Sequence, residues 1–276
     1  MVAEKAEKRN QLHKIDIMGV GVADVDYEIM EKFIAEAIGE RRKIAITYAS
    51  ANIINLSQQN PALSRMLNES DIVHPDGIGV WIASKIIDKK GLRERFNWTD
   101  CGYKFLELCC EKNWSIFFLG STTENLAKAR NKIEKRFPKL RIAGMKNGFD
   151  DVASEDIVEY INSTKPDIVW VGMSAPKQEL WIQANRKALD CYVVQSVGDI
   201  FSLFAGEKKR GPEFLQKLGL EWFFRLLYQP DKYLKRYTVG IPPFIFNVLK
   251  QKLNLKKLRS VKKIQKLAVE TESKIR

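Results

Sequence analysis

The segment Pro75-Asp76-Gly77-Ile78-Gly79 is the pattern in this sequence that points most directly to chemistry. It follows a β-rich run, Ile72 to His74, and precedes a helical run, Val80 to Ile87. A carboxylate on a strand-to-helix turn is well placed to accept a proton, and glycines beside it let a substrate approach closely. We therefore predict that Asp76 is a catalytic base. The alternative is that Asp76 only caps the helix that follows.

A second candidate is Gly120-Ser121-Thr122-Thr123-Glu124, which follows the apolar run Ser115 to Leu119. Free backbone N–H groups at a helix start, together with small hydroxyl side chains, can hold a phosphate. We therefore predict that Gly120 and Ser121 bind substrate. The same pattern is also that of an ordinary helix cap. No Walker lysine pattern is present, so a P-loop ATPase is not predicted.

A third candidate is Pro176-Lys177-Gln178-Glu179, after the strand-like run Asp167 to Val171. Proline is common in the first turn of a helix, so a helix is expected to begin here. Lys177 would bring positive charge to the sheet edge, and Gln178 can hydrogen-bond hydroxyl or uracil groups. The alternative is a solvated helix start with no ligand.

Metal and nucleotide-cofactor signals are weak. Asp24-Val25-Asp26 resembles a D-x-D metal motif, but it precedes a helical pattern, which favours a capping role. Gly19 and Gly21 lack the third glycine of a dinucleotide fingerprint. The chain has two histidines, which leaves little room for a Ser-His-Asp triad or a histidine metal site. We expect no metal and no required cofactor.

These candidates follow β-rich runs that alternate with helical patterns. The predicted strands are Lys14 to Met18, Lys43 to Tyr48, Ile72 to His74, Ser115 to Leu119, Arg141 to Ala143, Asp167 to Val171 and Cys191 to Val197. The predicted helices include Tyr27 to Ile38, Ile53 to Met66, Val80 to Ile87, Thr123 to Phe137, Ser154 to Asn162 and Lys177 to Lys187. Such alternation predicts an α/β fold, with a Rossmann-like, mostly parallel sheet and helices on both faces. Ligands of such sheets bind beyond the carboxyl ends of the strands.

Charge divides the chain into two parts. The 276 residues carry a formal net charge of +12. Residues 207–276 hold eighteen Lys or Arg and six Asp or Glu, so the whole excess lies there and residues 1–206 are neutral. We predict an α/β catalytic body over residues 1–206 and a basic helical appendage over residues 207–276. A basic appendage on a neutral body predicts an anionic partner surface.

The remaining features concern location. Met1 to Asn10 is charged and lacks the apolar core of a signal peptide. No window reaches the roughly 18 apolar residues of a membrane-spanning helix. The four cysteines, Cys101, Cys109, Cys110 and Cys191, include no C-x-x-C pair. We therefore expect a reduced, cytoplasmic protein whose membrane contact, if any, is peripheral.

Aromatic residues are interleaved with cations in the predicted appendage. Trp222, Phe223, Phe224 and Tyr228 surround Arg225, and Pro242 and Pro243 are expected to break the chain before a second basic stretch. This mixture is typical of a helix at the surface of an acidic membrane. Binding to nucleic acid is the alternative. Because no recognisable nucleic-acid-binding module is present, we do not expect that partner.

Several motifs together resemble the WecG/TagA/CpsF family of bacterial-type glycosyltransferases, over roughly residues 14–237. The resemblance lies in Pro75-Asp76-Gly77-Ile78-Gly79, Phe117-Phe118-Leu119-Gly120, Val171-Gly172 followed by Pro176-Lys177-Gln178-Glu179, Ala205-Gly206 through Arg210-Gly211-Pro212, Leu218-Gly219-Leu220-Glu221-Trp222 and Arg225-Leu226-Leu227. Their order and spacing make the set specific.

The resemblance implies an enzyme that moves a hexose or N-acetylhexosamine from a UDP-sugar to a polyprenyl-pyrophosphate-linked acceptor. The transfer inverts the sugar and needs no metal; it serves polysaccharide or cell-envelope synthesis at the inner face of the cell membrane. By the same resemblance Asp76 is the general base, and Gln178 contacts the ligand. Thr47 lies near the donor, Arg95 near its phosphates, and Arg210, Arg225 and Arg236 near the diphosphate.

Two departures from the family pattern keep another interpretation open. The usual Thr-x-Asn is Thr47-Tyr48-Ala49 here, and the usual Gly-Gly-x-Phe-Asp is Gly198-Asp199-Ile200-Phe201-Ser202. These differences motivate a second hypothesis, a sugar-nucleotide-binding or scaffold subunit without catalysis. The donor sugar, acceptor sugar and linkage stay open, as does a homo-oligomer.

Overall fold

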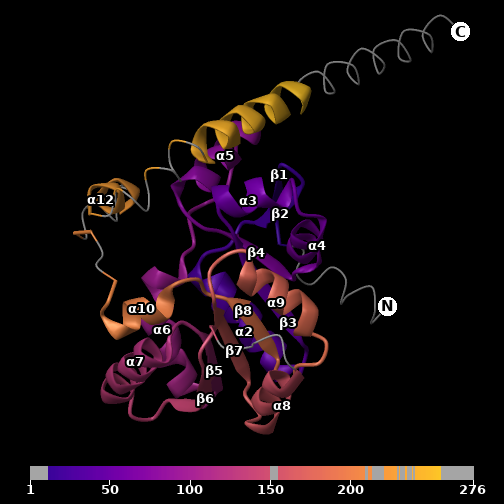
Figure 1. Ribbon diagram of the computed structural model, residues 1–276. Coiled ribbons are helices and arrows are strands. Elements are labelled where there is room, and N and C mark those ends of the chain that lie inside the picture. Colours follow the sequence, from indigo (N-terminus) through magenta and orange to yellow (C-terminus); the bar gives the residue numbers. More distant parts are fainter. Residues whose placement is uncertain are drawn as a thin grey trace, which may run out of the picture.

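Six parallel strands form the central sheet of the protein, which Figure 1 shows as a computed structural model. The structure describes residues 12–149, 155–208, 211–212, 221–228, 230, 234, 238 and 240–255. The strands of this sheet are β3 (Ile44–Ala49), β4 (Ile72–Pro75), β5 (Ser115–Gly120), β6 (Arg141–Lys146), β7 (Ile168–Gly172) and β8 (Val193–Ser196). Their order is β4-β3-β8-β7-β5-β6, and every neighbouring pair is parallel. The predicted parallel α/β sheet is confirmed.

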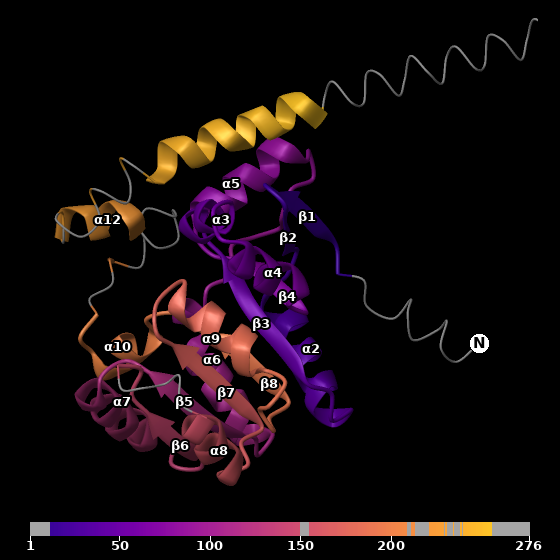
Figure 2. The same ribbon diagram turned by 45° about the vertical axis from the view of Figure 1, so that its right-hand side comes forward.

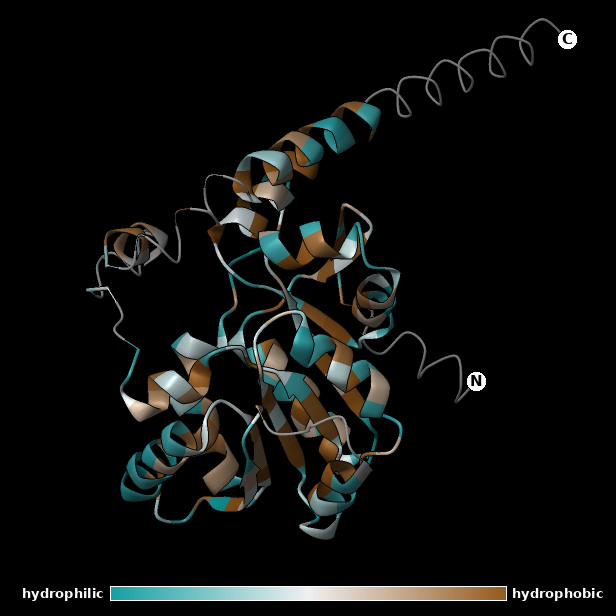
Figure 3. Ribbon diagram, viewed as in Figure 1, coloured by the Kyte–Doolittle hydropathy of each residue, from teal (hydrophilic) through white to brown (hydrophobic). Residues whose placement is uncertain are grey.

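Helices cover both faces of the sheet, as predicted. The helices are α2 (Tyr27–Gly39), α3 (Ala51–Ser57), α4 (Pro61–Glu69), α5 (Ile78–Ile87), α6 (Trp98–Glu111), α7 (Thr123–Arg136), α8 (Glu155–Ser163), α9 (Lys177–Asn185), α10 (Ile200–Ala205) and α12 (Glu221–Tyr228). Side chains of α3, α4, α5, α8 and α9 form one apolar cluster, and those of α2, α6, α7 and α10 form the other. Strand residues alternate between the clusters, because successive side chains point to opposite faces. Figure 3 shows the resulting apolar strands between more polar helices.

The first predicted strand lies outside this sheet. Strands β1 (Lys14–Ile17) and β2 (Val20–Ala23) form a separate antiparallel hairpin. The second of these strands was not predicted. Met18 and Gly19 join the strands, with φ of 54° and 82°. Two left-handed residues suit the twist of a tight hairpin, so the chain reverses here instead of crossing over to a parallel neighbour. The hairpin packs its apolar face against the α3, α4 and α5 side of the protein.

The predicted set of helices is corrected in two places. The segment Ile53 to Met66 is divided between α3 and α4, because Pro61 lacks an N–H and begins a new helix. The side chain of Asn60 caps this helix by accepting from the N–H groups of Ala62 and Leu63. Helix α6 was not among the predicted helices; Asn97 caps it, and Asp100 lies in its first turn. The polar residues at the start of α6 concealed the apolar face that follows.

A helix over residues 241–255 lies along α5, as the gold ribbon shows in Figures 1 and 2. Pro242 and Pro243 were expected to break the chain, but they occupy the first turn, where no N–H is needed. Phe244 and Val248 are 2% and 1% exposed and join the core beside α5. No helix among the described residues is both long enough and apolar enough to cross a bilayer.

Polar bonds hold the 241–255 helix to the body at three points. The carbonyl of Gly240 accepts from the amide of Asn55 in α3, at 2.8 Å. The side chain of Gln251 bonds the hairpin, accepting from Met18 N–H at 2.9 Å and donating to Asp16 Oδ1 at 2.8 Å. The ammonium of Lys252 donates to the carbonyl of Ile87 at 2.8 Å. Ile87 ends α5, so this positive charge complements the negative end of the helix dipole. The division between body and appendage near residue 207 stays a prediction.

Candidate active site

The carboxyl ends of the strands carry the candidate residues, because parallel strands present these ends at one edge of the sheet. Thr47 is in β3, Asp76 follows β4, and Gly120 ends β5. Lys177 and Gln178 begin α9, which follows β7. The strand order therefore places Asp76 next to the end of β3, whereas Gly120 lies four strands away, or about 19 Å.

Asp76 lies in a turn whose backbone is fixed on both sides. Its N–H donates to the carbonyl of Ala49 at 2.8 Å, which extends the β3–β4 pairing by one bond. Gly77 is the N-cap of α5 and has a φ of +84°, a conformation that favours glycine. Asp76 is therefore not the capping residue of α5. Its side chain is partly exposed at the sheet edge, which suits a base that meets a substrate.

The loop that carries Arg95 is joined to this turn. The N–H of Phe96 donates to the carbonyl of Pro75 at 2.9 Å. Arg95 Nη2 lies 3.6 Å from Asp100 Oδ2, and the Arg95 side chain is 21% exposed. A guanidinium thus lies on the segment next to the Asp76 turn, paired with the carboxylate of Asp100, and its predicted proximity to the donor phosphates stays a prediction.

Asp24 and Asp26 hold the same loop through Arg93. Asp24 is buried; its carboxylate accepts from the Arg93 N–H at 2.7 Å and lies 3.3 Å from Nε. Asp26 accepts from Arg93 Nη1 at 2.8 Å and also caps α2 by accepting from the N–H of Ile29. The capping role expected for this D-x-D pattern is confirmed, and both carboxylates serve as partners of an arginine.

Gln178 is fully buried at the edge, so the solvated helix start considered for this segment does not hold for Gln178, although Lys177 beside it is exposed. Its Nε2 donates to Tyr48 Oη at 3.0 Å and to Glu179 Oε1 at 2.6 Å. Its Oε1 accepts from the Gly198 N–H at 3.2 Å. Thr47 is also buried, and its hydroxyl lies 2.9 Å from that of Ser196 on β8. A polar network therefore joins the ends of β3, β7 and β8.

Gly120, Ser121 and Lys177 form a second group, at the ends of β5 and β7. A Cβ on Gly120 would lie 2.1 Å from the carbonyl oxygen of Gly172, so the two strand ends touch through their backbones. The Ser121 N–H donates to this same carbonyl at 3.1 Å. Lys177 Nζ donates to the carbonyl of Gly148 at 2.6 Å. The helix cap considered for this segment is also present, because Thr122 accepts from the N–H of Asn125.

Three predicted site residues belong to the C-terminal part. Arg210 and Arg236 lie outside the described residues, and so does the side chain of Arg225, whose backbone is in α12. Their proximity to a diphosphate stays a prediction.

Burial shifts the pKa of two groups near this edge. Burial lowers the pKa of His74 to about 3, so this imidazole beside Asp76 is neutral at physiological pH. Burial raises the pKa of Glu179 to about 7, although the Gln178 amide opposes that shift. The sequence did not identify Tyr48, Glu179, Ser196 or Gly198 as site residues. Their partners are distant in the chain, so local patterns carried no signal of these contacts.

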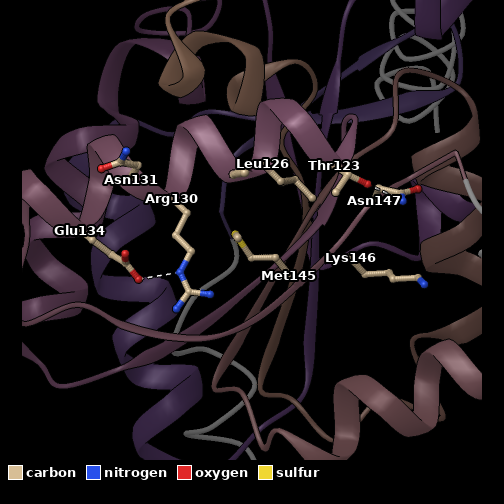
Figure 4. Close-up of a pocket in the computed structure, with 9 residues that line it drawn as sticks. Thr123, Leu126, Arg130, Asn131, Glu134, Met145, Lys146 and Asn147 are labelled. Carbon is tan, nitrogen blue, oxygen red and sulfur yellow. Dashed lines mark hydrogen bonds and ion pairs between the residues drawn. The ribbon is translucent and has the colours of Figure 1, made fainter.

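A cavity of about 570 Å³ lies elsewhere, between α7 and β6 (Figure 4). Leu126 and Met145 form its apolar part, and Arg130 at its rim pairs with Glu134 at 2.6 Å. Because β6 and β4 are the opposite edges of the sheet, about 24 Å separates this cavity from the Asp76 turn. We therefore place the candidate active site at the Asp76 edge, where the polar groups converge.

The fold is that of a Rossmann-like α/β protein, and a carboxylate follows one of its strand ends. The model of the "Glycosyl transferase WecG/TagA/CpsF family" matches residues 15–258. The chain belongs to this family and is a glycosyltransferase.

The relatives include proteins of Staphylococcus aureus strains NCTC 8325 and MRSA252. Both are named N-acetylglucosaminyldiphosphoundecaprenol N-acetyl-beta-D-mannosaminyltransferase. Each is 30% identical to this chain over 258 residues, which cover 92% of this chain and 99% of the relative. The resemblance found in the sequence motifs is thus confirmed.

Proposed function

We propose that the protein transfers an N-acetylhexosamine or hexose from a UDP-sugar to a polyprenyl-pyrophosphate-linked acceptor, with inversion at the transferred carbon. The observation that carries the proposal is the position of Asp76, a partly exposed carboxylate on the strand-end turn of a chain in this family. The names of the relatives support an acetylated hexosamine as the transferred group and a lipid-linked diphosphate as the acceptor. The process served would be polysaccharide or cell-envelope synthesis.

In the proposed reaction, the Asp76 carboxylate removes the proton of the acceptor hydroxyl. The acceptor oxygen forms a bond to C1 of the sugar from the face opposite UDP. The bond between C1 and the diphosphate oxygen breaks, and UDP leaves with that electron pair. Arg95, on the loop tied to the Asp76 turn, is placed to stabilise the departing diphosphate, a task that a metal performs in other enzymes.

Mass spectrometry tests the activity directly. Purified protein is incubated with a panel of UDP-sugars and a short-chain lipid-pyrophosphate acceptor carrying N-acetylglucosamine, with and without EDTA. We expect a product heavier by one sugar, with equal yield in EDTA. Asp76→Asn should lower turnover at least about 10³-fold and leave UDP affinity within about two-fold. Absence of product from every donor would favour the scaffold hypothesis, and full turnover by Asp76→Asn would exclude this base.

We also propose that the protein binds the inner face of the cell membrane through the 241–255 helix. Opposite its buried Phe244 and Val248, this helix exposes Phe246, Leu249 and Leu253, which are 67%, 47% and 58% exposed. Positions i, i+3 and i+7 share one face of a helix, so these side chains form an apolar stripe. The net positive charge of residues 207–276 supports attraction to acidic lipids.

Vesicle flotation separates this role from stability. Deleting the appendage would also remove Phe244 and Val248 from the core, so substitutions on the exposed face are a sharper test. Phe246→Glu with Leu253→Glu should abolish flotation with vesicles of anionic phospholipid and leave the melting temperature unchanged. Asn254→Glu on the same helix is the control for added negative charge. Flotation of the double variant at the wild-type level would exclude this surface.

A further inference from the structure

The buried network around Gln178 contains a carboxylic acid that the proposed reaction does not use. Glu179 and Gln178 both have 0% exposure. Glu179 Oε1 accepts from Gln178 Nε2 at 2.6 Å, and Glu179 Oε2 has no hydrogen-bond partner among the described residues. No ion pair to Glu179 occurs among the described residues; burial raises the pKa of this carboxyl, and hydrogen bonds from Gln178, Ser196 and its own backbone oppose that shift. A buried acid without a cation does less for stability than an apolar side chain of its size, so another role is indicated.

The hydrogen bonds fix which way the Gln178 amide faces. The Gly198 N–H is only a donor, so the Gln178 atom that faces it, 3.2 Å away, must be Oε1. Nε2 then faces Tyr48 and Glu179, and its two hydrogens are donated to these two oxygens. Glu179 therefore holds the amide in the orientation that the Gly198 N–H requires, and Tyr48, whose hydroxyl can donate or accept, adapts to it.

This orientation determines the direction of the Tyr48 hydroxyl. An amide NH₂ group cannot accept, so the Tyr48 oxygen accepts from it and the phenolic hydrogen points away from Gln178. Tyr48 lies opposite His74 in the β3–β4 pairing, and the centroids of these two rings are 6.0 Å apart. His74 precedes Asp76 by two residues. The next β3 residue, Ala49, accepts from the Asp76 N–H. The Tyr48 side chain is half-buried, and its strand pairs through Ala49 with Pro75, the residue before Asp76.

We propose that Glu179 is a positioning residue, which acts through Gln178 to direct the Tyr48 hydroxyl as a hydrogen-bond donor toward a hydroxyl or phosphate oxygen of the substrate bound beside Asp76. The role of Tyr48 as a ligand contact rests on the proposed transferase function. The orientation of Gln178 by Glu179 does not, so the two parts fail separately.

A double-mutant cycle tests the coupling between Glu179 and Tyr48. Tyr48→Phe removes one hydrogen bond and should lower kcat/KM about ten-fold. Glu179→Leu leaves Gln178 without its acceptor and should lower kcat/KM by a similar factor. Because both changes act on one contact, the double variant should fall no further than the worse single variant. Glu179→Gln keeps an acceptor oxygen and should restore kcat/KM to within about three-fold of the wild type.

Hydrogen exchange at the Gly198 amide gives a second readout that needs no activity. Glu179→Leu should speed this exchange about ten-fold, since Gln178 is then free to turn, and Glu179→Gln should not. Glu69→Ala is the control, because it removes surface bonds to Gln183 and Arg186 of the α9 region. If the losses of kcat/KM in Tyr48→Phe and Glu179→Leu multiply in the double variant, the two residues act independently and the proposed coupling is overturned. Unchanged Gly198 exchange in Glu179→Leu would overturn the positioning role, whatever the transferase assay gives.

Discussion

The N–H of Phe96 donates to the carbonyl oxygen of Pro75 at 2.9 Å, and this bond joins the segment carrying Arg95 to the turn carrying Asp76. Asp76 follows Pro75 and Arg95 precedes Phe96, so this one bond holds the two candidate site residues on adjacent segments. On its other side the segment is held by Arg93, whose partners Asp24 and Asp26 come from the start of α2. The position of Arg95 thus depends on Asp24 and Asp26, two carboxylates that lie about 70 residues earlier in the chain.

Removing Asp24 should loosen this segment. Asp24→Ala leaves the Arg93 N–H and guanidinium without their buried acceptor, so the free energy of unfolding should fall by about 2 kcal/mol in urea titrations. Turnover should fall as well, because Arg95 is no longer held. Asp190→Ala breaks an exposed pair with Lys43 and is the control; its loss should stay under about 0.5 kcal/mol. Equal losses of unfolding free energy in the two variants would show that Asp24 does not hold the segment carrying Arg95.

Acid should destabilise the protein through His74. The pKa of this imidazole is about 3 in the folded state and near 6.5 when unfolded, so the unfolded chain binds the extra proton between these values. Stability is therefore present above pH 6.5 and is lost as pH falls toward 3, by about 2 kcal/mol at pH 5. His74→Phe should lack this loss in unfolding titrations at pH 7 and pH 5. A variant that keeps the wild-type pH dependence would show that other groups cause it.

Replacing Gln195 should stabilise the protein. This β8 side chain has 0% exposure, and neither its Oε1 nor its Nε2 has a partner among the described residues. Gln195→Met removes the cost of burying an unpaired amide and should raise the free energy of unfolding by about 1–3 kcal/mol. Urea titration of Gln59→Met, which replaces an exposed glutamine, provides the comparison and should show no gain. A destabilised Gln195→Met would mean that the amide is satisfied.

The 241–255 helix should detach locally when Gln251 is shortened. Gln251→Ala removes bonds to Asp16 and Met18, each worth about 1 kcal/mol, while Phe244 and Val248 remain packed. We expect faster hydrogen exchange at Met18 and faster trypsin cleavage within the helix, with little change in global unfolding. Asn254→Ala, on the exposed side, should leave both rates as they are. Identical protection in the Gln251 variant would show that apolar packing alone holds the helix.

Local sequence patterns were sufficient to predict the layered fold and the position of Asp76 on a turn at a strand end. Strands such as β5 and β7 are continuous apolar runs, as expected for a sheet covered on both faces, and the glycines after Asp76 mark a turn at a strand end. The hairpin was hidden because its turn, Met18-Gly19, lacks the usual Asn-Gly or Asp-Gly signal. The strand order could not be predicted, since it depends on contacts between distant segments.

The network around Gln178 shows most clearly where sequence reasoning stops. Glu179 has the composition expected of an exposed acid in the first turn of a helix, where it would complement the dipole. Its burial follows from the packing of α9 against β7 and β8, and Tyr48 lies 130 residues before Gln178 in the chain. No local pattern distinguishes an acid that faces water from one enclosed between three strand ends.

Gln251 and Asp16 are separated by 235 positions, yet their side chains are bonded. A ribosome makes the hairpin long before residue 251, so the nascent protein lacks this partner while the six strands of the central sheet are synthesised. The bond between the hairpin and the 241–255 helix therefore forms only after the whole central sheet has been translated. Chains that terminate early would carry every β-strand and the proposed base, but not the segment that covers α5.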